Sequence, residues 1–149
     1  PGEPARPLGM VASGGELSRI MLALKAVLAE TDDIPTLIFD EIDTGISGRT
    51  AQMVSEKLSL IADSHQVICI THLPQIAAMA DSHYEIRKTA RDGRTATQIQ
   101  RLSEEQSIDE LARLLGGAEI TEAVRQNARE MRALAGVKKR RRAGGKAGR

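Results

Sequence analysis

The stretch that decides the fold is residues 36–71, which read TLIFDEIDTGISGRTAQMVSEKLSLIADSHQVICIT. Two short apolar runs, residues 36–39 and 67–70, look like buried strands. Between them, residues 49–62 place apolar side chains at helical spacing. A strand, a helix and a second strand in this order form a βαβ unit, whose right-handed crossover makes the strands parallel. We therefore expect an α/β fold with these two strands adjacent.

Polar residues follow both predicted strands, and parallel strands end at the same edge of a sheet, where open α/β sheets bind ligands. Asp40 and Glu41 follow the first strand, and Thr71 and His72 follow the second. Asp40 could hold Mg²⁺, which takes one or two carboxylates together with phosphate oxygens. Glu41 could orient or deprotonate an attacking water, and His72 could contact a phosphate oxygen. The alternative is that the two carboxylates only begin a loop.

A second candidate anion site opens the helix expected up to about residue 30. Ser13, Gly14 and Gly15 stand at its start, ahead of an apolar stripe at helical spacing. The free N–H groups and the positive end of the helix dipole favour a phosphate there, and glycine lets the backbone approach closely. The alternative is an ordinary N-cap in which Ser13 satisfies the first turn.

The order of these motifs resembles the carboxyl-terminal half of an ABC-type ATPase head. Residues 13–19 (SGGELSR) match its signature motif, and residues 36–41 (TLIFDE) match its Walker B strand. Residues 43–48 (DTGISG) match the D-loop, and His72 matches the switch histidine. The residues within these motifs are most similar to those of the SMC-like branch of this family, which includes bacterial DNA repair proteins. Glu16 departs from the glutamine that is more usual in transporter ATPases.

The resemblance implies a P-loop NTPase fold and two heads that sandwich two ATP molecules. In such a dimer Asp40 would serve Mg²⁺, Glu41 would act on the attacking water, and His72 would sense the γ-phosphate. Asp43 would cross the interface between heads. The γ-phosphate of nucleotide held by the opposite head would meet the signature residues Ser13, Gly14, Gly15 and Glu16. ATP-driven opening and closing would then act on DNA at breaks, in repair and recombination.

The rest of the sequence predicts a β-hairpin, two helices and a basic tail. An alternating pattern on both sides of Arg91-Asp92-Gly93-Arg94 indicates a β-hairpin, and two helices follow it. The hairpin strands are expected over residues 83–88 and 95–102, and the helices over 104–115 and 119–135. The domain plan is an extended lead-in (1–12), the carboxyl-terminal lobe of the ATPase head (13–135) and a basic disordered tail (136–149). Residues 138–149 carry seven basic side chains and no acidic one.

A phosphate-cradling P-loop, G-x-x-x-x-G-K-[ST], does not occur in this sequence. Its one Gly-Lys pair, Gly145-Lys146, is followed by Ala147. The family's amino-terminal lobe and long coiled coil are also missing from these 149 residues, which look like a piece of something longer. We therefore expect this chain to be inactive alone, with the missing lobe, a second head and DNA as partners of the complete protein.

Composition excludes several other classes of protein. Phe39 and Tyr84 are the only aromatic residues, so a stacking platform for single-stranded nucleic acid is excluded. A single cysteine, Cys69, rules out an internal disulfide and suits the cytoplasm. No apolar run approaches the length of a membrane span. Two alternative interpretations of the sequence are the head of another SMC-like or ABC ATPase, and a non-catalytic module whose basic tail binds nucleic acid. The tail could equally be a solvated terminus.

Overall fold

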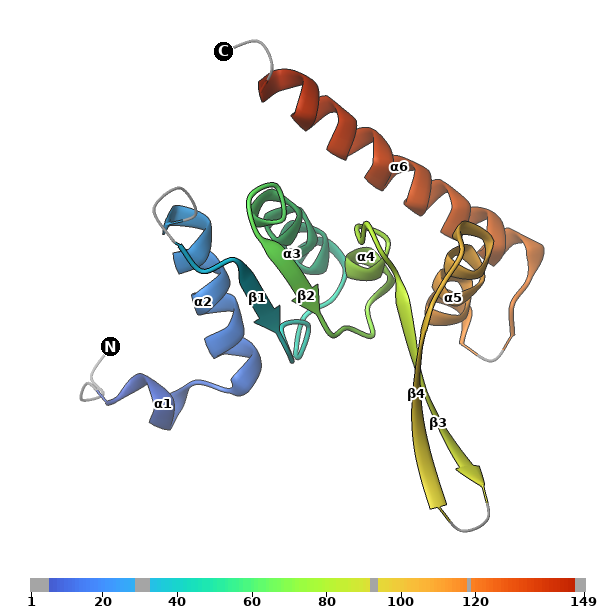
Figure 1. Cartoon of the computed structure of the whole chain (residues 1–149), viewed down its shortest axis with the longest axis horizontal. Helices are drawn as coiled ribbons and strands as arrows, with labels where there is room; N and C mark the ends of the chain where they lie inside the picture. Colours follow the sequence, from blue (N-terminus) through green and yellow to red (C-terminus); the bar gives the residue numbers. More distant parts are fainter. Residues whose placement is uncertain (1–5, 29–32, 92–93, 118, 147–149) are drawn as a thin grey trace. The chain divides into compact units, whose positions relative to one another are not determined.

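A computed structural model of the chain describes residues 6–28, 33–91, 94–117 and 119–146. They divide into two units, Pro1–Ile76 and Ala77–Arg149. Figure 1 follows the chain through six helices and four strands among the described residues. None of the helices in these ranges combines the length and apolarity that a membrane span requires.

The first unit contains the expected βαβ arrangement. Strand β1 (Thr36–Phe39) pairs in parallel with β2 (Gln66–Cys69), and helix α3 (Gly48–Ile61) connects them. Phe39 lies opposite Cys69, and the amide of Ile70 donates to the Phe39 carbonyl at 3.0 Å, so pairing continues to the strand ends. The prediction of two adjacent parallel strands is confirmed.

The core of this unit lies on one face of the sheet. Side chains alternate between the two faces of β1. Those of Leu37 and Phe39 face the core and are 8% and 4% exposed, whereas Ile38 between them is 67% exposed. Leu22 of helix α2 (Gly14–Leu28) joins the same core, together with Val54, Leu58 and Ile61 of α3. The expectation of fully buried strands was therefore wrong for the described residues: helices cover one face, and Ile38, Ile68 and Ile70 remain exposed on the other.

The start of the chain also differs from the extended lead-in expected over residues 1–12. Residues 8–11 form a short helix, α1 (Leu8–Val11), and residues 1–5 lie outside the described part of the chain. Pro7 precedes the helix, where its fixed φ suits a helix start, and its carbonyl accepts from Met10 N at 2.9 Å. A second short helix, α4 (Pro74–Ala77), begins at Pro74, where proline is tolerated in the first turn.

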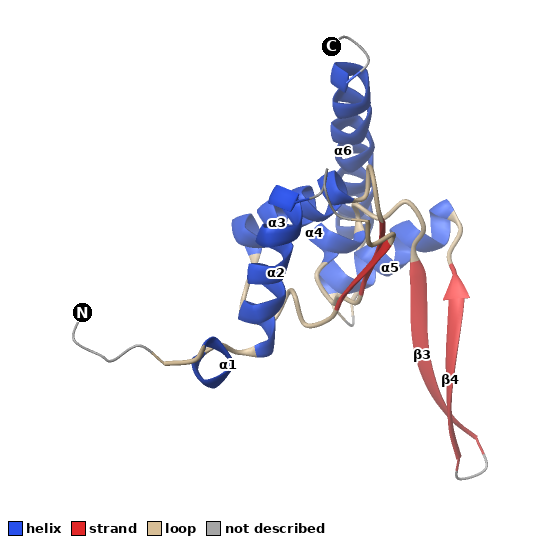
Figure 2. Ribbon diagram, turned by 60° about the vertical axis from the view of Figure 1, so that its left-hand side comes forward, coloured by secondary structure: helices blue, strands red, loops and turns tan. Residues whose placement is uncertain are grey.

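The second unit consists of a hairpin and two helices. Strands β3 (Tyr84–Arg91) and β4 (Arg94–Arg101) are antiparallel, and the turn at 92–93 lies outside the described residues. Helix α5 (Glu104–Gly116) begins with a capping box between Ser103 and Gln106. Helix α6 (Glu122–Lys146) packs against α5 through Ala128, which is fully buried beside Leu111. In Figures 1 and 2 the hairpin extends away from these helices.

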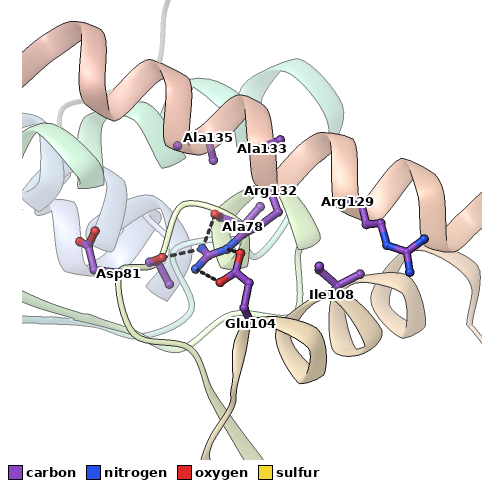
Figure 3. Close-up of a pocket in the computed structure, with 10 residues that line it drawn as sticks. Ala78, Asp81, Glu104, Ile108, Arg129, Arg132, Ala133 and Ala135 are labelled. Atoms are coloured by element: carbon purple, nitrogen blue, oxygen red, sulfur yellow. Dashed lines mark hydrogen bonds and ion pairs between the residues drawn. The ribbon is translucent and has the colours of Figure 1, made fainter.

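Arg132 ties α6 to the segment that follows α4. Its Nη1 donates to the carbonyls of Ala78 (2.8 Å) and Ala80 (2.6 Å), and its guanidinium also pairs with Glu104 of α5. This cluster lines a pocket of about 360 Å³. Figure 3 shows Arg132 beside Ala78 and Glu104 in this pocket. The Arg132 donors are therefore engaged within the unit, and the cluster holds its parts together.

Residues 136–146 of the predicted basic tail belong to helix α6 in the structure, whereas disorder was expected there. Helix α6 continues to Lys146, and residues 147–149 lie outside the described part of the chain. Residues 137–143 (VKKRRRA) are rich in lysine, arginine and alanine, which have high helix propensity. An already formed helix can therefore propagate into this stretch without apolar positions to bury.

Candidate functional site

Ser13 is the N-cap of helix α2 in this structure. Its hydroxyl accepts from Glu16 N at 3.3 Å, and the Glu16 carboxylate accepts from Ser13 N at 2.8 Å, which together form a capping box. The hydrogen bond from the Ser13 amide is the largest cause of the lowered pKa of Glu16. Both side chains thus stabilise the start of the helix, as the simpler alternative predicted. Contact of Ser13 and Glu16 with a phosphate stays a prediction.

Glu41 lies against the first turn of this helix. A β-carbon placed on Gly14 would collide with the Glu41 carboxylate, and one placed on Gly15 would lie 2.8 Å from the Glu41 carbonyl. Gly15 is therefore required for the close approach of the Glu41 carbonyl, whereas the flexible Glu41 side chain could move away from a β-carbon on Gly14. Glu41 has φ +57°, a left-handed conformation that is unfavourable for residues other than glycine. Such backbone strain is concentrated at functional sites.

Helix α2 holds the loop that follows β1 through two residues to which sequence reasoning gave no role. Ser18 Oγ donates to the Asp40 carbonyl at 2.8 Å. Arg19 Nη1 donates to the carbonyls of Thr44 at 2.8 Å and Ile42 at 3.2 Å. The signal was a pair of polar residues beside the apolar stripe of an amphipathic helix. These contacts fix the backbone that carries Asp40 and Glu41.

Asp43 connects the ends of the two strands. Its side chain is 4% exposed, and its Oδ2 accepts from Thr71 Oγ1 at 2.6 Å and from His72 N at 2.8 Å. His72 Nδ1 lies 3.0 Å from the same oxygen, while the His72 side chain is 72% exposed. Burial raises the pKa of Asp43, but the bonds from Thr71 and His72 outweigh it and leave the pKa lowered. Asp43 therefore orients His72 as a charged carboxylate.

These contacts are made within one chain. The crossing of an interface by Asp43 stays a prediction, and within the chain its carboxylate is occupied by Thr71 and His72. His72 Nε2 is the ring nitrogen that this pairing leaves for another partner. An Asp–His pair of this kind fixes the orientation of an imidazole.

Asp40 is exposed at the end of β1, and one of its oxygens accepts from Glu41 N at 2.9 Å. Among the described residues, no group of three or more His, Cys, Asp or Glu side chains could hold a metal. Mg²⁺ commonly takes one or two carboxylates, with water and phosphate oxygens for its other ligands. Asp40 thus fits as one ligand and cannot form a site by itself.

Cys69 ends β2 next to these carboxylates. Burial is the main cause that raises the pKa of its thiol to about 12, and the charges of Asp43 and Asp40 add to the effect. The thiol is protonated at neutral pH and is a poor nucleophile. It belongs to the packing of the strand, since the core of the first unit contacts it.

The sequence matches DNA repair protein RecN from several bacteria. The protein of Bacillus subtilis is 48% identical over 130 residues, that of Halalkalibacterium halodurans 50% over 135, and that of Vibrio cholerae 50% over 131. The chain is homologous to part of RecN. The matches cover 87–91% of this chain, and the chain spans only 23–24% of the length of these relatives. No protein-family model matches it.

The fold is similar to that of a solved chain from work on ATP-driven dimerization and DNA-stimulated activation of SMC ATPases. The two share 25% sequence identity at a TM-score of 0.50, over 74% of this chain and 65% of the solved one. Both the resemblance to an SMC-like ATPase and the expected α/β class, with parallel strands followed by a hairpin and helices, are confirmed.

Proposed function

We propose that this chain supplies one half of a composite ATP site in a RecN-like DNA repair ATPase, whose heads dimerise around nucleotide. The observation that carries the proposal is the position of Glu41, a left-handed residue at the end of β1 packed against Gly14 and Gly15. Because the RecN relatives are bacterial DNA repair proteins, we place its action on DNA in the bacterial cytoplasm.

ATP, bound together with Mg²⁺, would be the substrate, and the bond to its terminal phosphate would be broken. Asp40 would provide one carboxylate to the cation, with other ligands from water and phosphate. Glu41 would accept a proton from the attacking water and hold that water in line. The Asp43–His72 pair would direct Nε2 of His72 toward the γ-phosphate. Most contacts to the triphosphate would come from parts of the head outside these 149 residues.

The signature residues would act on the opposite head. Ser13 caps a fifteen-residue helix that begins with Gly14 and Gly15, and the N–H groups and dipole of this helix favour an anion. In the single chain the Glu41 carboxylate lies against this helix start. Head engagement would bring the partner's nucleotide to the Ser13 turn, where Glu16 already holds the cap in place.

Two variants of the complete protein test the proposal. Glu41→Gln should keep ATP-dependent dimerisation and stop hydrolysis, because glutamine is nearly isosteric but cannot accept the proton. Ser13→Arg should block dimerisation, because a bulky side chain fills the space meant for the partner's γ-phosphate. Light scattering with and without ATP, paired with phosphate release, separates the two. Equal dimerisation of both variants would reduce Ser13 to a helix cap.

The isolated chain offers a complementary measurement. It should release phosphate from ATP at the background rate with or without Mg²⁺, because phosphoryl transfer depends on charge neutralisation and positioning around the phosphates. Robust turnover by the isolated chain that disappears in Glu41→Gln would show that these 149 residues hold a complete site, and that the proposed division into halves is wrong.

A further inference from the structure

The β3–β4 hairpin is a projecting ribbon with two unlike faces. Cross-strand partners share a face, and the register pairs Arg87 with Gln98 and Glu85 with Gln100. Thr89 follows on the same side, which we call the polar face: Glu85, Arg87, Thr89, Gln98 and Gln100. The opposite side carries Tyr84, Ile86, Lys88, Thr95, Thr97, Ile99 and Arg101. All described side chains of residues 86–89 and 95–101 are exposed.

Charge distinguishes the hairpin from the rest of the chain. Residues 84–101 contain five basic and two acidic residues. Apart from the hairpin and residues 138–149, the chain has nine basic and eighteen acidic residues. A basic ribbon on an otherwise acidic protein creates a local positive potential that attracts polyanions.

Glu85 holds the guanidinium group of Arg87 in place for contact with an anion. Its Nε donates to Glu85 at 2.6 Å, and this pair is the main cause of the raised pKa of Arg87. Glu85 is 13% exposed, whereas the Arg87 side chain is 68% exposed. The carboxylate thus holds the guanidinium in one orientation while most of the Arg87 side chain stays exposed. A pre-oriented guanidinium loses less entropy when it binds a phosphate or a guanine edge.

We propose that the polar face of the hairpin binds duplex DNA. A two-stranded ribbon fits the major groove, where arginine and glutamine side chains form hydrogen bonds with base edges, and threonine and arginine with phosphates. Single-stranded nucleic acid fits poorly, because the polar face has no aromatic side chain for a base to stack on. The identification of the polyanion as DNA rests on the proposed repair function.

The two faces allow a matched pair of variants in the full chain. R87Q/Q98A/Q100A removes one positive charge and two side chains from the polar face. K88Q/T95A/T97A removes one positive charge and two side-chain hydroxyls from the opposite face of the same two strands. Binding to a fluorescent 20-base-pair duplex, without nucleotide, is measured by anisotropy at 50 and 200 mM salt. Far-UV circular dichroism and melting check that both variants fold.

The polar-face variant should bind roughly 10-fold or more weakly at 50 mM salt, from the loss of one charged and two neutral hydrogen-bonding groups. Each lost phosphate contact also lowers the salt slope by about 0.9, so the fall in affinity between 50 and 200 mM becomes about 3.5-fold smaller. The opposite-face variant should bind as the unaltered chain does. R87K, which keeps the charge, should keep the salt slope.

Three results would overturn the proposal. Equal weakening by both variants would mean that only overall charge matters and that the basic residues protect the edges of an exposed hairpin. Tighter binding of a 20-nucleotide single strand than of the duplex would contradict the groove-binding ribbon. Unchanged affinity of the polar-face variant would mean that other parts of the protein bind the DNA. None of these results bears on hydrolysis or head dimerisation, so the proposed function can fail or stand separately.

Discussion

Removal of the Asp43 carboxylate should loosen the end of β2. In Asp43→Ala, the part-buried His72 amide and Thr71 hydroxyl lose an acceptor at 2.8 and 2.6 Å that is itself only 4% exposed. A hydrogen bond to a charged group contributes about 1.5–3 kcal/mol, and a buried donor left unpaired costs a similar amount. Because the two bonds share one oxygen, we expect a loss of about 2–3 kcal/mol in total. Asp43→Asn keeps an acceptor oxygen and should lose about half as much.

Amide exchange of His72 measures this loss where it arises. A loss of 2–3 kcal/mol predicts roughly 30- to 150-fold faster exchange of the His72 N–H. Urea unfolding should show a parallel fall in the unfolding free energy. Asp33→Asn, the same change as Asp43→Asn at an exposed aspartate, is the control and should leave both measurements unchanged. Unaltered His72 exchange in Asp43→Ala would refute the assigned role of the carboxylate.

The same network predicts a pH dependence. Because the pKa of Asp43 is lowered in the folded chain, its stabilising effect is complete above the ordinary value of 3.8 and is lost as the pH falls through the folded value. Urea midpoints of the unaltered chain and Asp43→Asn should therefore differ at neutral pH and converge as the pH falls below about 4. A constant difference at all pH values would show that the charge of Asp43 has no part in it.

Three further outcomes are expected. Gly15→Ala should lower the unfolding free energy by about 1–3 kcal/mol in urea titrations, since its β-carbon would lie 2.8 Å from the Glu41 carbonyl; Gly9→Ala, with open space around it, is the control. Glu41→Asn should stabilise the chain by up to about 1 kcal/mol in the same assay, since asparagine tolerates φ +57° better, and no stabilisation would argue against strain there. Deletion of residues 139–149 should weaken duplex binding for all sequences and flatten its salt dependence, because it removes six basic residues; unchanged affinity at low salt would make this segment a solvated end.

The sequence predicts the elements of this fold well because each has a local signal. The apolar runs, the helical spacing over residues 49–62 and the alternation around the hairpin appear as expected, within two or three residues at most ends. The capping box at Ser13 and Glu16 is likewise a local pattern, S-x-x-E, and it has the role that the simpler interpretation gave it.

The missed features depend on contacts between residues far apart in the chain. Arg19 lies 25 residues from Thr44, and Asp43 lies 28 from Thr71, so no spacing rule predicts that they meet. The position of Asp43 at an interface, expected from its motif, stays a prediction, and its burial became visible only once both strand ends were placed. For the tail, the expectation of disorder was wrong because it relied on charge alone. Lysine and arginine extend a helix readily, and α6 continues through this segment.

The protonated thiol at the end of β2 has a practical consequence for spectroscopy. With its pKa at about 12, roughly one Cys69 in 100,000 is a thiolate at neutral pH, so maleimide and iodoacetamide reagents attack it slowly. A cysteine introduced at an exposed position, such as Thr97 of the hairpin, ionises some thousand times more readily. Dyes and spin labels can therefore be attached at one chosen residue while the native cysteine keeps its place in the strand, and the chain carries a nearly silent background for distance measurements.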